Sequence, residues 1–225
     1  MFFNPLTFLF MILFFFVVIF FFALVQINII ALAFAKIGVP SHYIFTALFA
    51  SLFGSLVNIP VKKIPQEIMA DETRVSFFGF RHVVPLRRRQ ETVIAVNVGG
   101  AVVPIILSLY LLFKTDVWGS ALIATSIMTI VTFRVAKPVR GLGIALPAFV
   151  PGVVAALIAV TIAYDYAPVV AYIAGTMGTL IGADLLNLKK IRGLGAPVAS
   201  IGGAGTFDGI FLNGILAVLL AALVA

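Results

Sequence analysis

The chain has 225 residues, of which 63% are apolar and only 10% are charged, and its mean hydropathy is +1.22. These values exclude an ordinary soluble domain and predict a multi-pass integral membrane protein. The net charge of +7 does not predict a nucleic-acid partner, because the cations lie between apolar runs, where they set membrane topology. With no cysteine there is no thiolate metal site, and we expect neither metal nor cofactor.

Seven apolar runs use nearly all of the sequence and predict transmembrane helices, of which the second is short. The chain is therefore expected to be an all-α membrane protein with about seven spans, forming a single polytopic domain over residues 1–225 of unknown oligomeric state. The predicted helices cover 6–35, 41–57, 92–113, 118–133, 143–163, 168–188 and 201–224.

The segment at about 60–91 is the only long polar one and is expected to be a loop on the cytoplasmic side. Within and beside it, residues 74–81 and 92–97 have the β-branched and aromatic composition of strands. A small β-ribbon is therefore expected there. Residues 92–97 fit the start of the third helix equally well.

The orientation follows from the distribution of Lys and Arg. The loops after the second, fourth and sixth predicted helices hold 13 of the 15 cations. Because cytoplasmic loops are enriched in cations, the N-terminus is expected in the cytoplasm and the C-terminus outside.

Two acidic residues are predicted to lie within the membrane helices, Asp184 near the end of the sixth and Asp208 near the start of the seventh. Both are expected near the cytoplasmic face, where an antiparallel hairpin brings them opposite one another. Ionisable groups inside a bilayer are costly and therefore often functional. Purely structural roles are the alternatives. Asp184 would form an ion pair with Lys189, Lys190 or Arg192, and Asp208 would form a hydrogen bond with Thr206 or Asn213.

Two adjacent carboxylates that share one proton suit peptide hydrolysis. The ionised aspartate accepts a proton from a water as it attacks the carbonyl carbon, and the protonated one donates to the carbonyl oxygen. Two prolines in the run 144–152 predict an irregular helix, either beside a cavity or as a plain kink. Asn58, Asn97 and Asn213 are expected to be interhelical hydrogen-bond partners.

Three motifs resemble an archaeal and bacterial family of polytopic membrane proteins, the domain of unknown function sixteen-fourteen. They are Pro147-Ala148-Phe149-Val150-Pro151, Gly182-Ala183-Asp184-Leu185-Leu186 and Gly202-Gly203-Ala204-Gly205-Thr206-Phe207-Asp208-Gly209-Ile210. The resemblance covers most of the chain and implies no activity.

The layout also resembles presenilin-type intramembrane aspartyl proteases, which carry one catalytic aspartate in each of two successive helices. The resemblance implies that Asp184 and Asp208 are the catalytic pair and that the substrate is a transmembrane or membrane-anchored peptide. Pro147-Ala148-Phe149 is similar to the Pro-Ala-Leu motif of those enzymes. With Gly205, Thr206 and Phe207, it is expected to bind substrate.

Two other functions fit the same residues. The aspartates would serve a transporter or channel as a proton or cation relay, for which glycine-rich and broken helices are also typical. They would serve a non-catalytic scaffold as interhelical hydrogen-bond acceptors. A water-bridged pair in an open cavity favours hydrolysis, and a polar path across the bilayer favours transport.

Overall fold

The structure is a computed structural model that describes residues 15–16, 19, 26–75, 81–139, 141, 143–147, 149–191, 194, 196–203 and 209–225. For residues 41, 48, 66–75, 81–90 and 209 within this set, only the backbone is described. Most of the predicted first helix, 6–35, lies outside the described residues, which include its last part as a helix over Gln26–Lys36.

The described chain is mostly helical, as predicted. The α-helices after Gln26–Lys36 are α2 (Ser41–Gly54), α3 (Val103–Thr115), α4 (Trp118–Val135), α5 (Val150–Ile162), α6 (Ala167–Thr179) and α7 (Gly209–Val224). Four short helical segments flank them: the π-helices η1 (Val98–Val102) and η3 (Leu180–Leu185), and the 3₁₀ turns η2 (Tyr164–Tyr166) and η4 (Leu188–Ile191).

Three described helical stretches are long and apolar enough to cross a bilayer, namely Val98–Thr115, Trp118–Val135 and Tyr164–Leu185. The helices Gln26–Lys36, His42–Gly54, Val150–Ile162 and Ile210–Val224 are apolar but shorter. Helices of this length and composition are typical of a membrane protein, which agrees with the predicted protein class.

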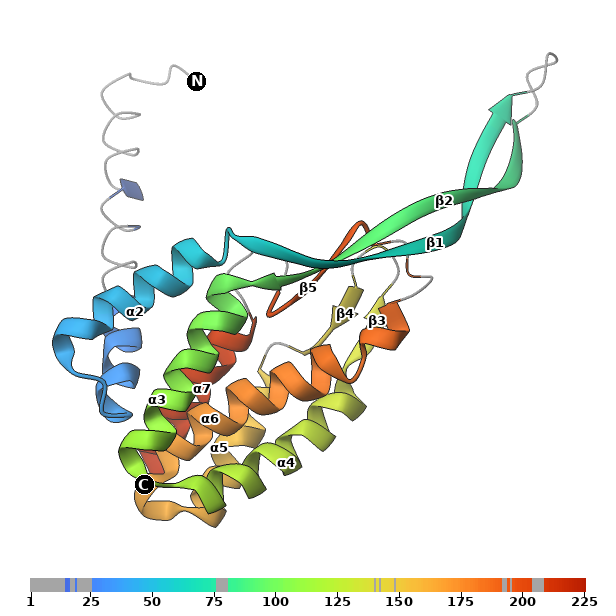
Figure 1. Cartoon of the computed structure of the whole chain (residues 1–225). Helices are drawn as coiled ribbons and strands as arrows, with labels where there is room; N and C mark the ends of the chain where they lie inside the picture. The colour runs from blue at the N-terminus through green and yellow to red at the C-terminus, as the bar shows by residue number, and fades with distance from the viewer. Residues whose placement is uncertain are drawn as a thin grey trace, which may run out of the picture.

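The helices run back and forth, so the molecule has two distinct ends (Figure 1). At one end, here called the turn end, lie the reversals at 37–40, 116–117 and 163–166 together with the C-terminus. At the opposite end, the strand end, lie all the strands, η1 and η3. Asp184 therefore belongs to the strand end.

Small residues let the helices approach closely. A Cβ placed at Gly178 of α6 would lie 2.6 Å from the Met128 Cβ of α4, and one at Gly182 would collide with Thr132. The Thr132 hydroxyl donates to the Gly178 carbonyl oxygen at 2.9 Å. One turn earlier in α6, Gly175 faces Ala155 and Ala217. Small residues and hydroxyls of this kind hold helices together in lipid, where apolar burial alone does not.

The strands form a long ribbon that projects past the helices (Figure 1). β1 (Asn58–Val75) and β2 (Arg81–Asn97) pair antiparallel from Asn58↔Asn97 to Val75↔Arg81. At about 3.3 Å per residue, such a ribbon is about 55 Å long. β5 (Val198–Ile201) adds in parallel to the helix-proximal part of β2, giving the order β1-β2-β5. β3 (Lys137–Val139) and β4 (Gly143–Ala145) form a separate small hairpin.

The ribbon confirms the expected β-structure but corrects its extent. The expected loop over about 60–91 with only a small ribbon is wrong in extent, since strands occupy most of it. A single strand over 74–81 is also wrong, because Val75 and Arg81 pair with each other in opposite strands. Residues 92–97 are strand, so the third helix begins at Val98 and not at 92. Pro60 and Pro65 make β1 difficult to recognise as a strand from its sequence. They are tolerated because β1 is an edge strand, where a missing N–H need not break a ladder.

Two other predicted helices start later than expected, so the prediction of an all-α chain is also incomplete. Residues 143–145 are β4, and α5 begins at Val150 with Pro151 in its first turn, where proline costs no hydrogen bond. Residues 198–201 are β5, and α7 begins at Gly209. Gly202 and Gly203 have φ of +86° and +96°, which no helix accommodates. The helix predicted over 118–133 is confirmed as α4.

Candidate functional site

Of the eight residues predicted to form the site, the structure describes three, Pro147, Phe149 and Asp184. Ala148, Gly205, Thr206, Phe207 and Asp208 lie outside the described residues. The site is therefore built outward from Asp184.

Asp184 lies on η3, the wide turn that continues α6. The Leu186 N–H donates to the Ile181 carbonyl oxygen at 2.9 Å, a bond five residues back, as in a π-helix. The Asn187 side chain closes the turn by donating from Nδ2 to the carbonyl oxygens of Gly182 and Ala183, at 2.9 and 3.1 Å. π-turns inside helices frequently occur at functional sites, because they turn a side chain away from the regular helix face.

The Asp184 carboxylate accepts a hydrogen bond through Oδ2 from the Gly202 backbone N–H at 2.8 Å. Gly202 follows β5, and its φ of +86° favours glycine. A Cβ at Gly202 would lie 2.7 Å from both the N and the Cβ of Ala101. The carboxylate thus fixes the end of β5 against η1, where only glycine fits.

The beginning of α7 lies beside the helix that carries Asp184. Leu180, one turn before Asp184, and Ile210, two residues after Asp208, belong to one buried cluster with Ala101. These three side chains are 3%, 6% and 0% exposed. The contact joins η3, α7 and η1 at the strand end.

A second polar group, here called the ribbon base, consists of Asn58, Asn97 and Ser200. The buried Asn97 side chain donates from Nδ2 to the Ser55 carbonyl oxygen at 2.7 Å and to Asn58 Oδ1 at 3.1 Å, and its Oδ1 accepts from the Gly100 N–H at 2.7 Å. The Ser200 hydroxyl also donates to Asn58 Oδ1, at 2.6 Å. The ribbon base thus ties all three strands to α2 and η1.

The expectation that Asn58, Asn97 and Asn213 form interhelical hydrogen bonds is not met as stated. Asn58 and Asn97 lie in strands and bond to each other and to the ends of α2 and η1, and Asn213 Oδ1 has no hydrogen-bond partner among the described residues. Ser200 was missed by the sequence reasoning, as was Thr92, whose hydroxyl donates to the Ala196 carbonyl oxygen at 2.6 Å. A signal was present, since Ser200 is a polar residue inside an apolar run and Thr92 is one at the start of another.

The alternative in which Asp184 pairs with Lys189 or Lys190 finds no support among the described residues, where Asp184 has no ion pair. Lys190 instead places its Nζ 4.7 Å from the centre of the Phe133 ring. Arg192 lies outside the described residues. A carboxylate held by a backbone N–H, with no described cation beside it, keeps its second oxygen available for another partner.

Pro147 and Phe149 lie just before α5, at the strand end. Phe149 is 73% exposed, so within the described structure it is not packed against Asp184. No group of three or more His, Cys, Asp or Glu side chains that could hold a metal occurs in the described parts of the chain.

Comparison with models of known protein families gave a match. The profile of a family described as Protein of unknown function (DUF1614) matches residues 52–220, which include both strands of the ribbon and Asp184. Neither a curated protein nor a solved structure matches the chain.

Proposed function

Because the chain belongs to the DUF1614 family, whose description assigns no activity, we propose its function from its own residues: an intramembrane aspartyl protease that uses Asp184 and Asp208. The observation that carries the proposal is the hydrogen bond from the Gly202 N–H to the Asp184 carboxylate. It anchors the glycine-rich segment that leads to Asp208 directly at the first aspartate.

Chain distance supports a meeting of the two carboxylates. Asp208 is six residues after Gly202 and two before Ile210, and both of these residues contact the region of η3 and η1 around Asp184. Leu180 precedes Asp184 by one helical turn of about 5.4 Å, so the two described ends of the segment 202–210, Gly202 and Ile210, both lie near Asp184, and we propose that Asp208 meets it there. If the two aspartates lay far apart, the chain would have to leave the strand end after Gly202 and return to it before Ile210.

The proposed reaction is hydrolysis of a peptide bond. The ionised aspartate takes a proton from water as the water oxygen attacks the carbonyl carbon, and the protonated aspartate gives its proton to the carbonyl oxygen. Collapse of the tetrahedral intermediate breaks the C–N bond, with the leaving nitrogen protonated by the pair. The Gly202 N–H holds one oxygen of Asp184 and orients the other for this exchange.

The proposed substrate is a transmembrane or membrane-anchored peptide whose helix unwinds before cleavage. The outer edge of β1 has no partner strand among the described residues, and it lies at the same end as Asp184. An extended substrate segment would add to this edge through backbone hydrogen bonds. In this proposal the chain crosses the bilayer seven times with the strand end in the cytoplasm, as the cation distribution favours.

The test is cleavage of a single-span substrate by the full chain in liposomes. Asp184→Asn and Asp208→Asn are each expected to abolish cleavage, whereas Asp116→Asn, a matched change at the turn end, retains it. Cleavage by either dyad variant at the wild-type rate would disprove the mechanism. Deletion of residues 74–80 tests strand addition separately. Undiminished cleavage in that variant would refute substrate binding by strand addition and leave the catalytic mechanism untouched.

A proton or cation transporter is the second candidate, and one observation favours it. The oxygen atoms Oγ of Ser108, Oγ1 of Thr176, Oγ1 of Thr179 and Oδ1 of Asn213 are buried and have no hydrogen-bond partner among the described residues. They lie on α3, α6 and α7, between the two ends. Proton flux into liposomes that is lost in Asp184→Asn, with no cleavage in wild type, would select this function.

A further inference from the structure

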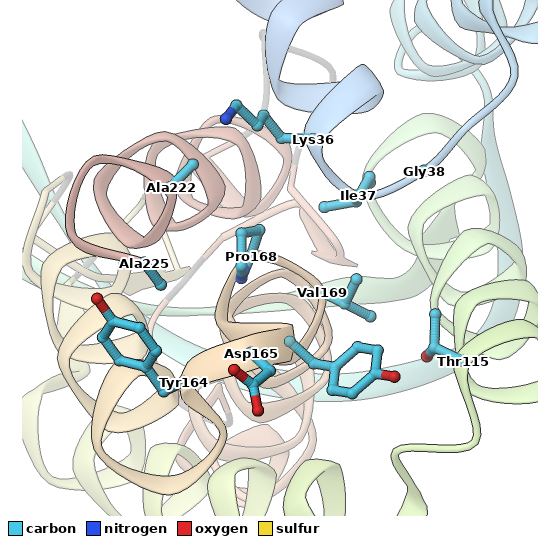
Figure 2. A pocket seen from close by; sticks show the side chains of 11 residues that line it. Lys36, Ile37, Gly38, Thr115, Tyr164, Asp165, Pro168, Val169, Ala222 and Ala225 are labelled. Atoms are coloured by element: carbon cyan, nitrogen blue, oxygen red, sulfur yellow. The ribbon is translucent and has the colours of Figure 1, made fainter.

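A cavity of about 450 Å³ opens at the turn end (Figure 2), whereas Asp184 belongs to the strand end. Its walls come from the turn after helix Gln26–Lys36, the end of α3, η2 with the start of α6, and the end of α7. The volume is typical of a small-molecule site. Because the cavity joins segments far apart in sequence, no single motif predicted it.

Opposite charges line this cavity. Lys36 contributes an ammonium group from one wall and Asp165 a carboxylate from another, and Figure 2 shows them well separated across the opening. Neither makes a hydrogen bond or ion pair with any residue that the structure describes. Two unpaired opposite charges on facing walls favour a ligand that carries both charges, because such a ligand satisfies each side chain without leaving a net charge in the cavity.

Hydroxyl groups and apolar side chains complete the lining. Thr115, Tyr164 and Tyr166 supply hydroxyls, and Val169 and Ala222 supply apolar surface. The Tyr164 hydroxyl donates to the Val224 carbonyl oxygen at 2.8 Å, which holds the end of α7 against η2. Tyrosine with lysine at the ends of apolar helices is typical of the level of lipid headgroups.

Exposed apolar side chains lie beside the cavity on two helices. Leu32, one turn before Lys36, is 54% exposed, and Leu223, next to Ala222, is 82% exposed. Such exposed apolar side chains at a polar cavity fit a molecule with a charged head and an aliphatic tail.

We infer that this cavity binds the headgroup of a zwitterionic phospholipid, with a primary ammonium bonded to Asp165 and a phosphate bonded to Lys36, as in phosphatidylethanolamine. The Tyr166 hydroxyl donates to a phosphate oxygen, while the Tyr164 hydroxyl stays bonded to the Val224 carbonyl oxygen, and the acyl chains run along the exposed leucines. The site is independent of the proposed protease, since no residue is shared between them.

The test is native mass spectrometry of the full chain in detergent with phospholipids of identical acyl chains. Wild type is expected to retain phosphatidylethanolamine about tenfold better than phosphatidylglycerol, which has no ammonium. Asp165→Asn removes this preference by lowering ethanolamine-lipid retention alone. Lys36→Gln lowers retention of both lipids, because both carry the phosphate.

Matched controls separate the site from general charge effects. Asp116→Asn changes a carboxylate at the same end outside the cavity, and Lys189→Gln changes an exposed lysine at the other end; both are expected to bind as wild type. Equal retention of the ethanolamine lipid by wild type, Asp165→Asn and Lys36→Gln would overturn the inference, as would equal losses in the controls.

Free O-phosphoethanolamine distinguishes the source of the headgroup. If it fails to displace the bound lipid at a hundredfold excess, the acyl chains contribute and the ligand is a lipid. If it displaces the lipid completely and binds alone with the same dependence on Asp165 and Lys36, the headgroup chemistry stands but the lipid assignment is overturned.

Discussion

The Asp184 carboxylate and the Gly202 backbone N–H lie 2.8 Å apart, and their bond connects the π-turn after α6 to the end of β5. Asp184 lies in that π-turn, and Gly202 is the first residue after the strand. The fold near the candidate site therefore depends on a side chain that is also the candidate catalytic group.

Substitution at Asp184 separates these two roles. Asp184→Asn keeps an oxygen acceptor for the Gly202 N–H, so its unfolding free energy is expected to stay within about 0.5 kcal/mol of wild type. Asp184→Ala leaves that N–H without its partner and is expected to cost about 1–3 kcal/mol. Thermal unfolding in detergent measures both. Equal destabilisation by the two variants would show that the hydrogen bond contributes nothing.

The backbone at Gly202 provides a second test. Gly202→Ala is expected to cost about 1–3 kcal/mol more than Gly141→Ala, because the added methyl overpacks against Ala101. Gly141 is the matched control, since its φ of +77° is similar and its Cβ position has open space around it. Both variants carry the same left-handed strain, so the difference in their unfolding free energies reports the collision. No difference would argue against the close approach to η1.

Asn97 is expected to control the stability of the ribbon base. Asn97→Ala removes three hydrogen bonds and leaves the Gly100 N–H without its acceptor, which we expect to cost about 2–3 kcal/mol. Amide hydrogen exchange of residues 92–97 should accelerate about a hundredfold, with α4 unchanged. Thr161→Ala, which removes an exposed hydroxyl on α5, is the control and should leave the ribbon protected. Equal exchange in both variants would contradict the assignment.

The α4–α6 contact predicts opposite effects for two glycine substitutions. Gly182→Ala places a methyl group against the Thr132 hydroxyl and the Thr129 carbonyl oxygen and is expected to destabilise the protein by about 1–3 kcal/mol. Gly119→Ala on α4 has open space and is expected to stabilise it by about 0.5–1 kcal/mol, because alanine loses less backbone freedom in a helix. Unfolding midpoints that shift in the same direction would contradict this packing.

Local patterns predicted the helices that are bounded by local signals. The range 118–133 agrees with α4 because Asp116 and Arg134 flank a stretch that contains no charged residue. The range 143–163 was too long, since nothing in Gly143-Ile144-Ala145 distinguishes a short strand from the first turn of an apolar helix. Its strand character comes from pairing with Lys137–Val139, a contact outside that segment.

The ribbon was even harder to predict from local sequence. Its strands are polar and contain prolines, so of the two strands that composition predicted, only 92–97 lies within one strand of the ribbon. Each strand is stabilised by its partner through a continuous antiparallel ladder, and β5 joins from about 105 residues further along the chain. Such pairing joins distant segments, so the pattern of apolar and polar residues within one strand does not predict it.

The amino-acid sequence by itself determined that this is an apolar, largely helical membrane protein with an acidic residue at the end of a long helix, because the transfer of apolar side chains out of water depends on composition and helical hydrogen bonds are local. Only the tertiary structure decided what that acid touches. The Asp184–Gly202 bond, the ribbon base and the charged cavity at the turn end each join segments that are distant in the chain, and their geometry exists only once the helices and strands have packed.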